Sequence, residues 1–285
     1  MDKQDHLLVV PIGITAAILI YLVAWNVYIS LTNWSLLNPV PKVTWLYSYY
    51  EAMKEAIFLQ SLAHSLELSI TVVVAGDLLG ILIAWLLYDI GSNTARSVFL
   101  SIFIYPLAIA MAVSAIIWMW LYNPTIGIDW LLAKVGLPEI PWLSAGWMVF
   151  PSVEIMSVWA YAGLAVIFFL AAFMGVNPSL VEAAKIDGAG SFKILRKVLL
   201  PNSLSGFVVA TAMLFLFSFK EFSGPLIISG TPVATYTTTM VTYLYYLSTV
   251  EFFAESSAVS TIVIIIATAV IIPYALYIIR RFIRG

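Results

Sequence analysis

Six long apolar segments restrict this chain of 285 residues to a fold that is solvated by lipid. A helix needs roughly 20 mostly apolar residues to cross a bilayer. The predicted spans are residues 7–31, 65–87, 97–121, 152–174, 204–222 and 258–279. We therefore predict an all-α fold, a polytopic membrane helix bundle with six transmembrane helices in a single domain over residues 1–285. The first segment is too long for the apolar region of a signal peptide, so we expect the chain to retain it.

The composition argues against several classes of function. Apolar residues make up 62% of the chain and charged residues 10%, compared with about 45–50% and about 25% in soluble domains. The net charge of −2 gives no support for nucleic-acid binding. The chain has no cysteine and two histidines, which argues against disulfides, thiol catalysis and a cysteine- or histidine-rich metal site.

The Lys and Arg residues predict how the chain is oriented in a cell membrane. With the N-terminus inside, nine of them fall in inside segments and three in outside loops. The positive-inside rule then makes both termini and the loop at about 175–203 cytoplasmic, and the loop at about 223–257 external. The nine inside residues are Lys3, Arg96, Lys185, Lys193, Arg196, Lys197, Arg280, Arg281 and Arg284, and the three outside residues are Lys42, Lys54 and Lys134.

The predicted outside loops are rich in aromatic residues. An aromatic belt at the membrane interface explains most of their tryptophans, which are Trp34, Trp45, Trp130, Trp142 and Trp147. The external segment at 223–257 is rich in Gly, Pro and Thr and then in Tyr. Loops of this length without a core are often functional.

Small and acidic residues interrupt the apolar surface of the second span. Gly76, Gly80 and Ala84 recur every four residues, a spacing that lets two helices approach closely, so we expect them to pack inside the bundle. Asp77 lies beside this seam. A carboxylate within a span usually faces a cavity or a partner, so Asp77 is either a hydrogen-bonded packing residue or a polar contact along a solute path.

Three further places in the spans suggest a path or a gate. Pro106 interrupts the third span, and Gly163, close to Trp159, interrupts the fourth. Broken helices line cavities in transporters, although a simple kink is an equal alternative. Lys220 and Glu221 end the fifth span and, as neighbours in sequence, point in different directions. They either extend to the outer interface or form part of an outer gate.

The loop at 175–203 is a basic, polar segment that is predicted to fold as a helix, a turn and a second helix. Ser179 and Glu182 fit a capping box, so the first helix is predicted to begin near Leu180. Gly188 fits a left-handed cap that ends it. From the residues alone, docking to another protein and binding to anionic lipid through the basic residues are equally favoured.

A signature in this loop resembles the coupling loop of permease subunits in binding-protein-dependent ATP-binding-cassette importers. It consists of EAA, two residues, DG, nine residues and V-x-LP over residues 182–201. In that family the short helix seats in a groove on a cytoplasmic ATPase. The resemblance implies that Val198, Leu200 and Pro201 support the helix. It also implies the residues that couple to the ATPase: Glu182, Ala183, Ala184, Lys185, Asp187 and Gly188.

The resemblance extends over most of the chain and leans towards the maltose-type carbohydrate permeases. Matching segments include residues 33–35, 127–132 and 230–232. It implies the permease fold of type I ATP-binding-cassette importers and a translocation subunit of a sugar importer rather than an enzyme. The implied partners are a second permease subunit that forms a heterodimer, two ATP-binding subunits and an extracytoplasmic solute-binding protein. Candidate residues for the path or gate are Asp77, Trp159, Lys220 and Glu221.

No cofactor, metal ion or catalytic residue is expected in this chain. It lacks the G-x-x-x-x-G-K-[ST] phosphate loop, so ATP and Mg²⁺ are expected on the partner ATPases. The alternatives are a permease of the same kind for a polyamine, an anion or iron, a secondary transporter, or a membrane-embedded enzyme. An enzyme would need clustered acidic or histidine side chains, whereas the acidic residues of the spans are dispersed.

Overall fold

The computed structural model describes residues 3–284, and the side chains of residues 1–9, 278 and 281–285 lie outside its described part. The described residues form helices joined by turns, with isolated bridges at Thr32–Val43 and Ser35–Asn38. The six longest helices are α1 (Lys3–Ser30), α3 (Ala56–Tyr88), α4 (Asn93–Ala108), α7 (Gly146–Met174), α11 (Leu204–Phe219) and α14 (Phe253–Arg284). The remaining helices are α2 (Tyr47–Lys54), α5 (Met111–Leu121), α6 (Ile128–Lys134), α8 (Pro178–Ile186), α9 (Ser191–Ile194), α10 (Leu200–Asn202), α12 (Ser223–Ser229) and α13 (Met240–Thr249).

Within the described residues, five stretches are long and apolar enough to cross a membrane. They are Val10–Ser30, Ala56–Tyr88, Gly146–Met174, Leu204–Ser229 and Phe253–Tyr277. The predicted third span is not one straight helix, because α4 and α5 meet at a bend of 97° and give a sixth span only if they are counted together. The bend follows Pro106, which has no N–H to continue the hydrogen-bond ladder of α4.

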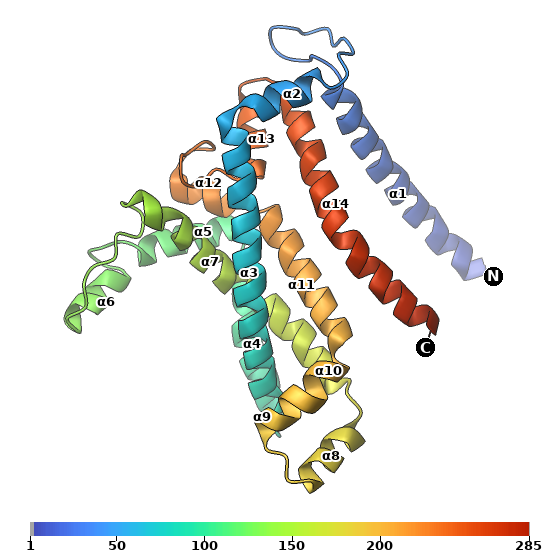
Figure 1. Cartoon of the computed structure of the whole chain (residues 1–285), viewed down its shortest axis with the longest axis vertical. Coiled ribbons are helices and arrows are strands. Elements are labelled where there is room, and N and C mark those ends of the chain that lie inside the picture. The colour runs from blue at the N-terminus through green and yellow to red at the C-terminus, as the bar shows by residue number, and fades with distance from the viewer. Residues whose placement is uncertain (1–2, 285) are drawn as a thin grey trace.

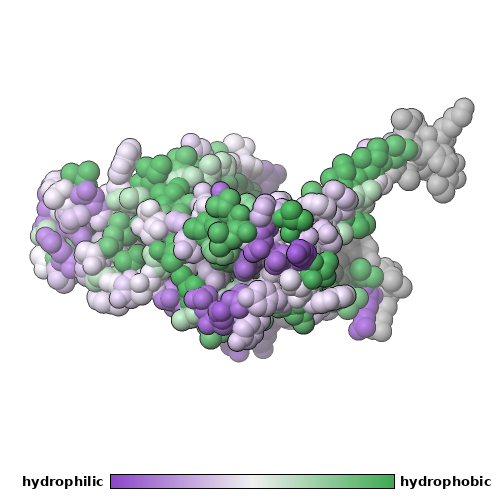
Figure 2. Space-filling view, turned by 90° about the horizontal axis from the view of Figure 1, so that it is seen from above, coloured by the Kyte–Doolittle hydropathy of each residue, from purple (hydrophilic) through white to green (hydrophobic). Residues whose placement is uncertain are grey.

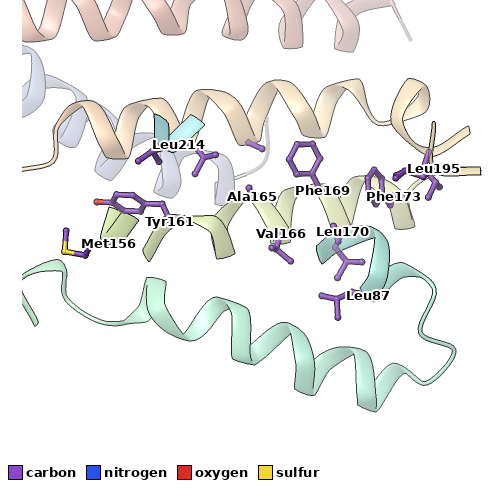
Figure 3. Packing of buried hydrophobic residues seen from close by; sticks show 14 of the residues in the cluster. Leu87, Met156, Tyr161, Ala165, Val166, Phe169, Leu170, Phe173, Leu195 and Leu214 are labelled. Atoms are coloured by element: carbon purple, nitrogen blue, oxygen red, sulfur yellow. The ribbon is translucent and has the colours of Figure 1, made fainter. Parts of the chain in front are cut away.

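The core lies where α7 packs against α3, α4 and α11. Figure 3 shows side chains of α7, among them Phe169 and Leu170, between α11 and α4. Small residues of α3 bring these helices together, as the sequence predicted. A Cβ on Gly80 would lie 2.5 Å from the Cβ of Ala165, and one on Gly76 would lie 3.0 Å from the Leu214 side chain.

The prediction that Gly163 interrupts the fourth span is wrong, because α7 runs unbroken from Gly146 to Met174. Gly163 instead lets the backbone of α4 come close. A side chain at this position would collide with the carbonyl oxygen of Phe103. The glycine is therefore a packing residue between α7 and α4.

Two helices, α1 and α14, lie side by side at the edge of the bundle (Figure 1). The side-chain amide of Asn26 joins them by donating a hydrogen bond to Thr261 Oγ1 at 3.0 Å. Most of α1 faces outwards, and only 6% of the residues in its most apolar stretch are buried. Figure 2 shows it as a largely hydrophobic rod that projects from the body of the molecule.

The segment 223–257, predicted as a long loop without a core, contains two helices, α12 and α13. A capping box formed by Thr239 and Thr242 starts α13. Burial of Tyr243 in α13 raises its phenol pKa to about 12, so this side chain stays neutral at ordinary pH. The segment is therefore an ordered part of the bundle.

The N-terminal end of α3 is fastened to this ordered segment. Ser65 Oγ accepts a hydrogen bond from the backbone N–H of Met240 at 2.8 Å. The ring of His64 contacts the carbonyl oxygen of Thr238 at 3.0 Å through Nδ1, and the side-chain amide of Gln60 donates to the carbonyl oxygen of Thr235.

Candidate functional site

The candidate site is the helical connection between α7 and α11, whose first helix, α8, extends beyond the end of the bundle (Figure 1). Asn177 caps α8. Its side-chain oxygen accepts hydrogen bonds from the backbone N–H of Ser179 at 3.0 Å and from the Ser179 hydroxyl at 2.9 Å. The predicted capping box of Ser179 and Glu182 is therefore wrong, and α8 begins at Pro178 rather than near Leu180.

The end of α8 matches the prediction. Gly188 has a φ of +74°, in the left-handed region that favours glycine. The backbone N–H of Gly188 donates to the carbonyl oxygen of Lys185 at 3.0 Å, and that of Ala189 donates to the carbonyl oxygen of Ala184 at 2.9 Å. These bonds satisfy the free carbonyl groups at the helix end and turn the chain sharply towards α9.

One side of α8 is anchored in the core and the other faces outwards. Val181 is 5% exposed and belongs to the main hydrophobic cluster, and Ala184 packs against that cluster. Ile186, by contrast, is 86% exposed. The other outward-facing residues include Leu180, which is 46% exposed, and Glu182, Ala183, Lys185 and Asp187. The helix thus presents a narrow surface with small, apolar and charged side chains to a potential partner.

The second half of the connection is held by the C-terminal end of α3. Trp85 Nε1 donates a hydrogen bond to Ser191 Oγ at 3.0 Å, and the Ser191 hydroxyl donates to the Asp89 carboxylate. The Trp85 ring also lies edge-on to Phe192, with ring centroids 6.0 Å apart. The connection is therefore attached directly to α3.

A π-helical turn, Leu195–Leu199, follows α9 and leads through α10 into α11. Leu195 and Leu199 are buried in the core cluster, and Val198 and Leu200 pack against it, whereas Pro201 is exposed. The basic side chains of α9 and of this turn point outwards. They belong to Lys193, Arg196 and Lys197.

Asp77, a candidate for the solute path, lies buried between α3 and α11. The residue is 6% exposed. Its Oδ2 accepts a hydrogen bond from Thr211 Oγ1 at 2.7 Å, while its Oδ1 is buried without a partner among the described residues. In this conformation Asp77 is a packing residue, and one of its two carboxylate oxygens, Oδ1, remains available to accept a hydrogen bond.

Lys220 and Glu221 have opposite environments. Lys220 is exposed, and its Nζ lies 5.0 Å from the ring centroid of Phe217. Glu221 is 6% exposed, accepts a hydrogen bond from the Tyr161 hydroxyl, and accepts another from the backbone N–H of Gly224 at 2.9 Å. The expectation that both side chains extend to the interface is therefore wrong for Glu221.

Trp159 lies elsewhere, on α7, where its ring packs edge-on against Trp118 of α5 with centroids 5.7 Å apart. The four candidates for a path or gate thus occupy three separate places: the α3–α11 contact, the α5–α7 contact and the end of α11. Sequence reasoning missed Tyr161. The only signal was its place on α7 close to Gly163, which says nothing about a partner sixty residues later.

Comparison with known proteins identifies the class of this arrangement. Residues 76–285 match the family described as "Binding-protein-dependent transport system inner membrane component". The chain is 52% identical over 284 residues to the glucose import system permease protein GlcT of Saccharolobus solfataricus, covering 100% of this chain and 99% of that protein. It is 25% identical over 257 residues to the xylose/arabinose import permease protein XacH of Haloferax volcanii, covering 89% and 80%.

The fold is also that of a solved transporter chain. A chain of a bacterial transporter involved in the import of the acidic polysaccharide alginate superposes with a TM-score of 0.79, covering 98% of this chain and 96% of that one. The sequence identity of that pair is 21%. The match therefore shows that the bundle as a whole has the fold of a chain from a solved transporter.

Proposed function

This chain belongs to the family of binding-protein-dependent transport system inner membrane components, and we propose that it forms part of the translocation path of an ATP-driven sugar importer. A subunit of this family is a translocation component and not an enzyme. Sugar is the favoured solute because relatives named for glucose and for xylose/arabinose import match 100% and 89% of the chain. A polyamine, anion or iron permease is the alternative within the same fold.

In this proposal α8 is the element that docks into the cytoplasmic ATPase. The observation that carries it is the contrast between the two sides of α8, with Val181 buried in the core and Ile186 86% exposed. A helix mounted in this way can transmit a push to the bundle. Moving a two-state equilibrium from 1:99 to 99:1 requires about 5.5 kcal/mol of differential binding, which a loosely held loop could not transmit.

The proposed orientation places α8 and both chain ends in the cytoplasm. In Figure 1 the two chain ends point to the side of the bundle that carries α8, while α2, α12 and α13 lie at the other side. This arrangement agrees with the excess of Lys and Arg on the α8 side. The outer side would receive the solute from an extracytoplasmic binding protein.

The proposed complex contains a second permease subunit and two ATP-binding subunits. A path between two permease subunits needs polar groups that become available when the helices move. Asp77 suits this role because its Oδ1 is buried with no partner in the described part of the chain, and Lys220 suits it because it is exposed at the outer end of α11. Trp159 and Glu221 would shape the path from α7 and from the segment between α11 and α12.

The test of the docking role is Glu182→Lys, with Glu139→Lys as the matched control. Both glutamates are exposed, and Glu139 lies in the hairpin after α5, far from α8 along the chain. We expect Glu182→Lys to abolish sugar uptake and retention of the ATPase during affinity purification, with normal insertion into the membrane. The control should retain the ATPase. Uptake and ATPase retention at wild-type levels in Glu182→Lys would contradict the proposal.

A further inference from the structure

The hairpin after α5, residues 122–145, stands away from the bundle and carries the short helix α6 (Figure 1). Asp129 folds the hairpin back on itself. Its carboxylate accepts a hydrogen bond from Trp142 Nε1 at 3.0 Å and another from the backbone N–H of Ile140 at 3.3 Å. Asp129 is 2% exposed, so this side of α6 is fixed against the returning segment.

The opposite side of α6 carries large apolar side chains. Trp130, Leu131 and Val135 are 48%, 58% and 71% exposed. They share one helix face with Lys134, because residues four positions apart lie above one another. We call Trp130, Leu131, Lys134 and Val135 the α6 face. Two more exposed apolar side chains, Ile126 and Leu137, flank the helix.

The side chains of the α6 face have the chemistry of the lipid headgroup region. Lys134 Nζ lies 3.6 Å from the centre of the Trp130 ring, so the charge and the indole are held together. Tryptophan concentrates at membrane interfaces, and lysine places its ammonium group near phosphate while its stem covers apolar surface. The single charge on this face is positive and therefore complements lipid phosphate.

Two of the other outer-loop tryptophans are engaged differently, whereas Trp45 and Trp147 are 72% and 71% exposed. Trp142 stacks on Tyr122 with ring centroids 5.0 Å apart, and Trp34 lies 4.9 Å from Phe253. Both use their rings for packing within the subunit. Trp130 instead lies on a helix that projects sideways from the bundle, on the side that also carries α12 and α13 (Figure 1). A helix in this place meets the bilayer next to the spans.

We propose that the α6 face is a membrane anchor that lies in the headgroup region of the bilayer. Leu131 and Val135 then enter the boundary with the acyl chains, and Lys134 lies at the level of the phosphates. Only the choice of the outer leaflet rests on the orientation proposed above. The anchor fixes the far end of the bent α4–α5 pair, and α5 packs directly against α12.

Paired spin labels on α6 test this proposal. The chain has no cysteine, so Leu131→Cys and Ala133→Cys each give one labelled site, and at two residues' separation Ala133 lies on the side of α6 opposite Leu131. The labelled full chain is placed in nanodiscs of phosphatidylcholine and phosphatidylglycerol, alone and with its transporter partners. We expect the label at 131 to be more accessible to oxygen than to a water-soluble nickel complex, and the label at 133 to show the reverse.

Three outcomes would overturn the anchor. The first is nickel accessibility at both positions, which would mean that the face lies in water. The second is shielding of position 131 from both reagents in the assembled transporter, which would mean that a protein subunit covers it. The third is immobilisation of that label on addition of the solute-binding protein. If Leu131→Cys does not fold, Val135→Cys reports on the same face. None of these readouts depends on uptake or ATP hydrolysis, so the anchor and the transport function can fail separately.

Discussion

The hydroxyl of Tyr161 on α7 donates a hydrogen bond to the carboxylate of Glu221 at the end of α11. Both side chains are buried. The same carboxylate accepts the backbone N–H of Gly224 in the first turn of α12. One acidic side chain thus joins three helices where the path is expected to open, so its loss should loosen all three contacts at once.

We expect Glu221→Ala to destabilise the protein strongly and Glu221→Gln to do so much less. A hydrogen bond to a charged group contributes about 1.5–3 kcal/mol, and alanine removes two of them, whereas glutamine still offers an oxygen acceptor. The measurement is the apparent melting temperature of the purified transporter in detergent. Lys220→Ala, next to it but exposed, is the control and should melt like the wild type. If Glu221→Ala has the same melting temperature as the control, the Glu221 carboxylate does not hold the three helices together.

Gly188→Val should weaken coupling, and Gly188→Asn should largely preserve it. A Cβ at this position meets nothing within 4 Å, so the effect comes from the backbone alone. A left-handed conformation costs an ordinary residue roughly 1–2 kcal/mol, whereas asparagine tolerates it better. Sugar uptake and sugar-stimulated ATP hydrolysis are the readouts. Gly190→Ala serves as control, since Gly190 has a φ of −70° and open space around it. Full coupling in Gly188→Val would show that the turn tolerates another conformation.

Gly163→Ala should destabilise the bundle because the added methyl group would collide with the carbonyl oxygen of Phe103. Overpacking of this kind costs about 1–3 kcal/mol. We expect a lower melting temperature and a lower yield of folded protein by size-exclusion chromatography. Gly91→Ala, where a Cβ meets nothing within 4 Å, should behave like the wild type. If the two variants have the same stability, α4 and α7 do not approach as closely as described.

Asn177→Ala should fray the start of α8, whereas Ser179→Ala should leave it largely intact. Replacing a capping residue by alanine costs about 0.5–2 kcal/mol, and the structure gives the capping oxygen to Asn177. Hydrogen exchange of the amides of residues 178–182, followed by mass spectrometry, measures the opening of this turn. Faster exchange in Ser179→Ala than in Asn177→Ala would restore the capping box predicted from the sequence.

The apolar segments predicted most of the bundle because hydropathy alone determines which segments must lie in lipid. The sequence predicted an interruption at Pro106 but not the size of the bend, since a proline breaks the hydrogen-bond ladder of a helix without determining the angle. Gly163 was misread because glycine in a membrane helix serves either to kink it or to let another backbone approach. Only the position of Phe103 in space, sixty residues earlier in the sequence, decides between these roles.

The candidate site was predictable where the signal is local. The left-handed turn at Gly188 follows from the chain around it, and the small residues of α8 follow from the EAA signature. The cap was misassigned because Asn177 and Ser179 are both good capping residues two positions apart. The burial of Glu221 could not be predicted, because it depends on Tyr161 of another helix and on the short helix α12, which begins only two residues later.

Helix α3 has 33 residues, or about 50 Å at 1.5 Å per residue, whereas the hydrocarbon core is about 30 Å thick. It is fastened towards both ends, at Ser65 by Met240 and at Trp85 by Ser191. A continuous helix that is attached in this way holds its two attachment points at a fixed distance from each other. Under the proposed function, we therefore expect the entrance and the exit of the path to rearrange together, because a displacement at the α8 side would tilt α3 as a whole.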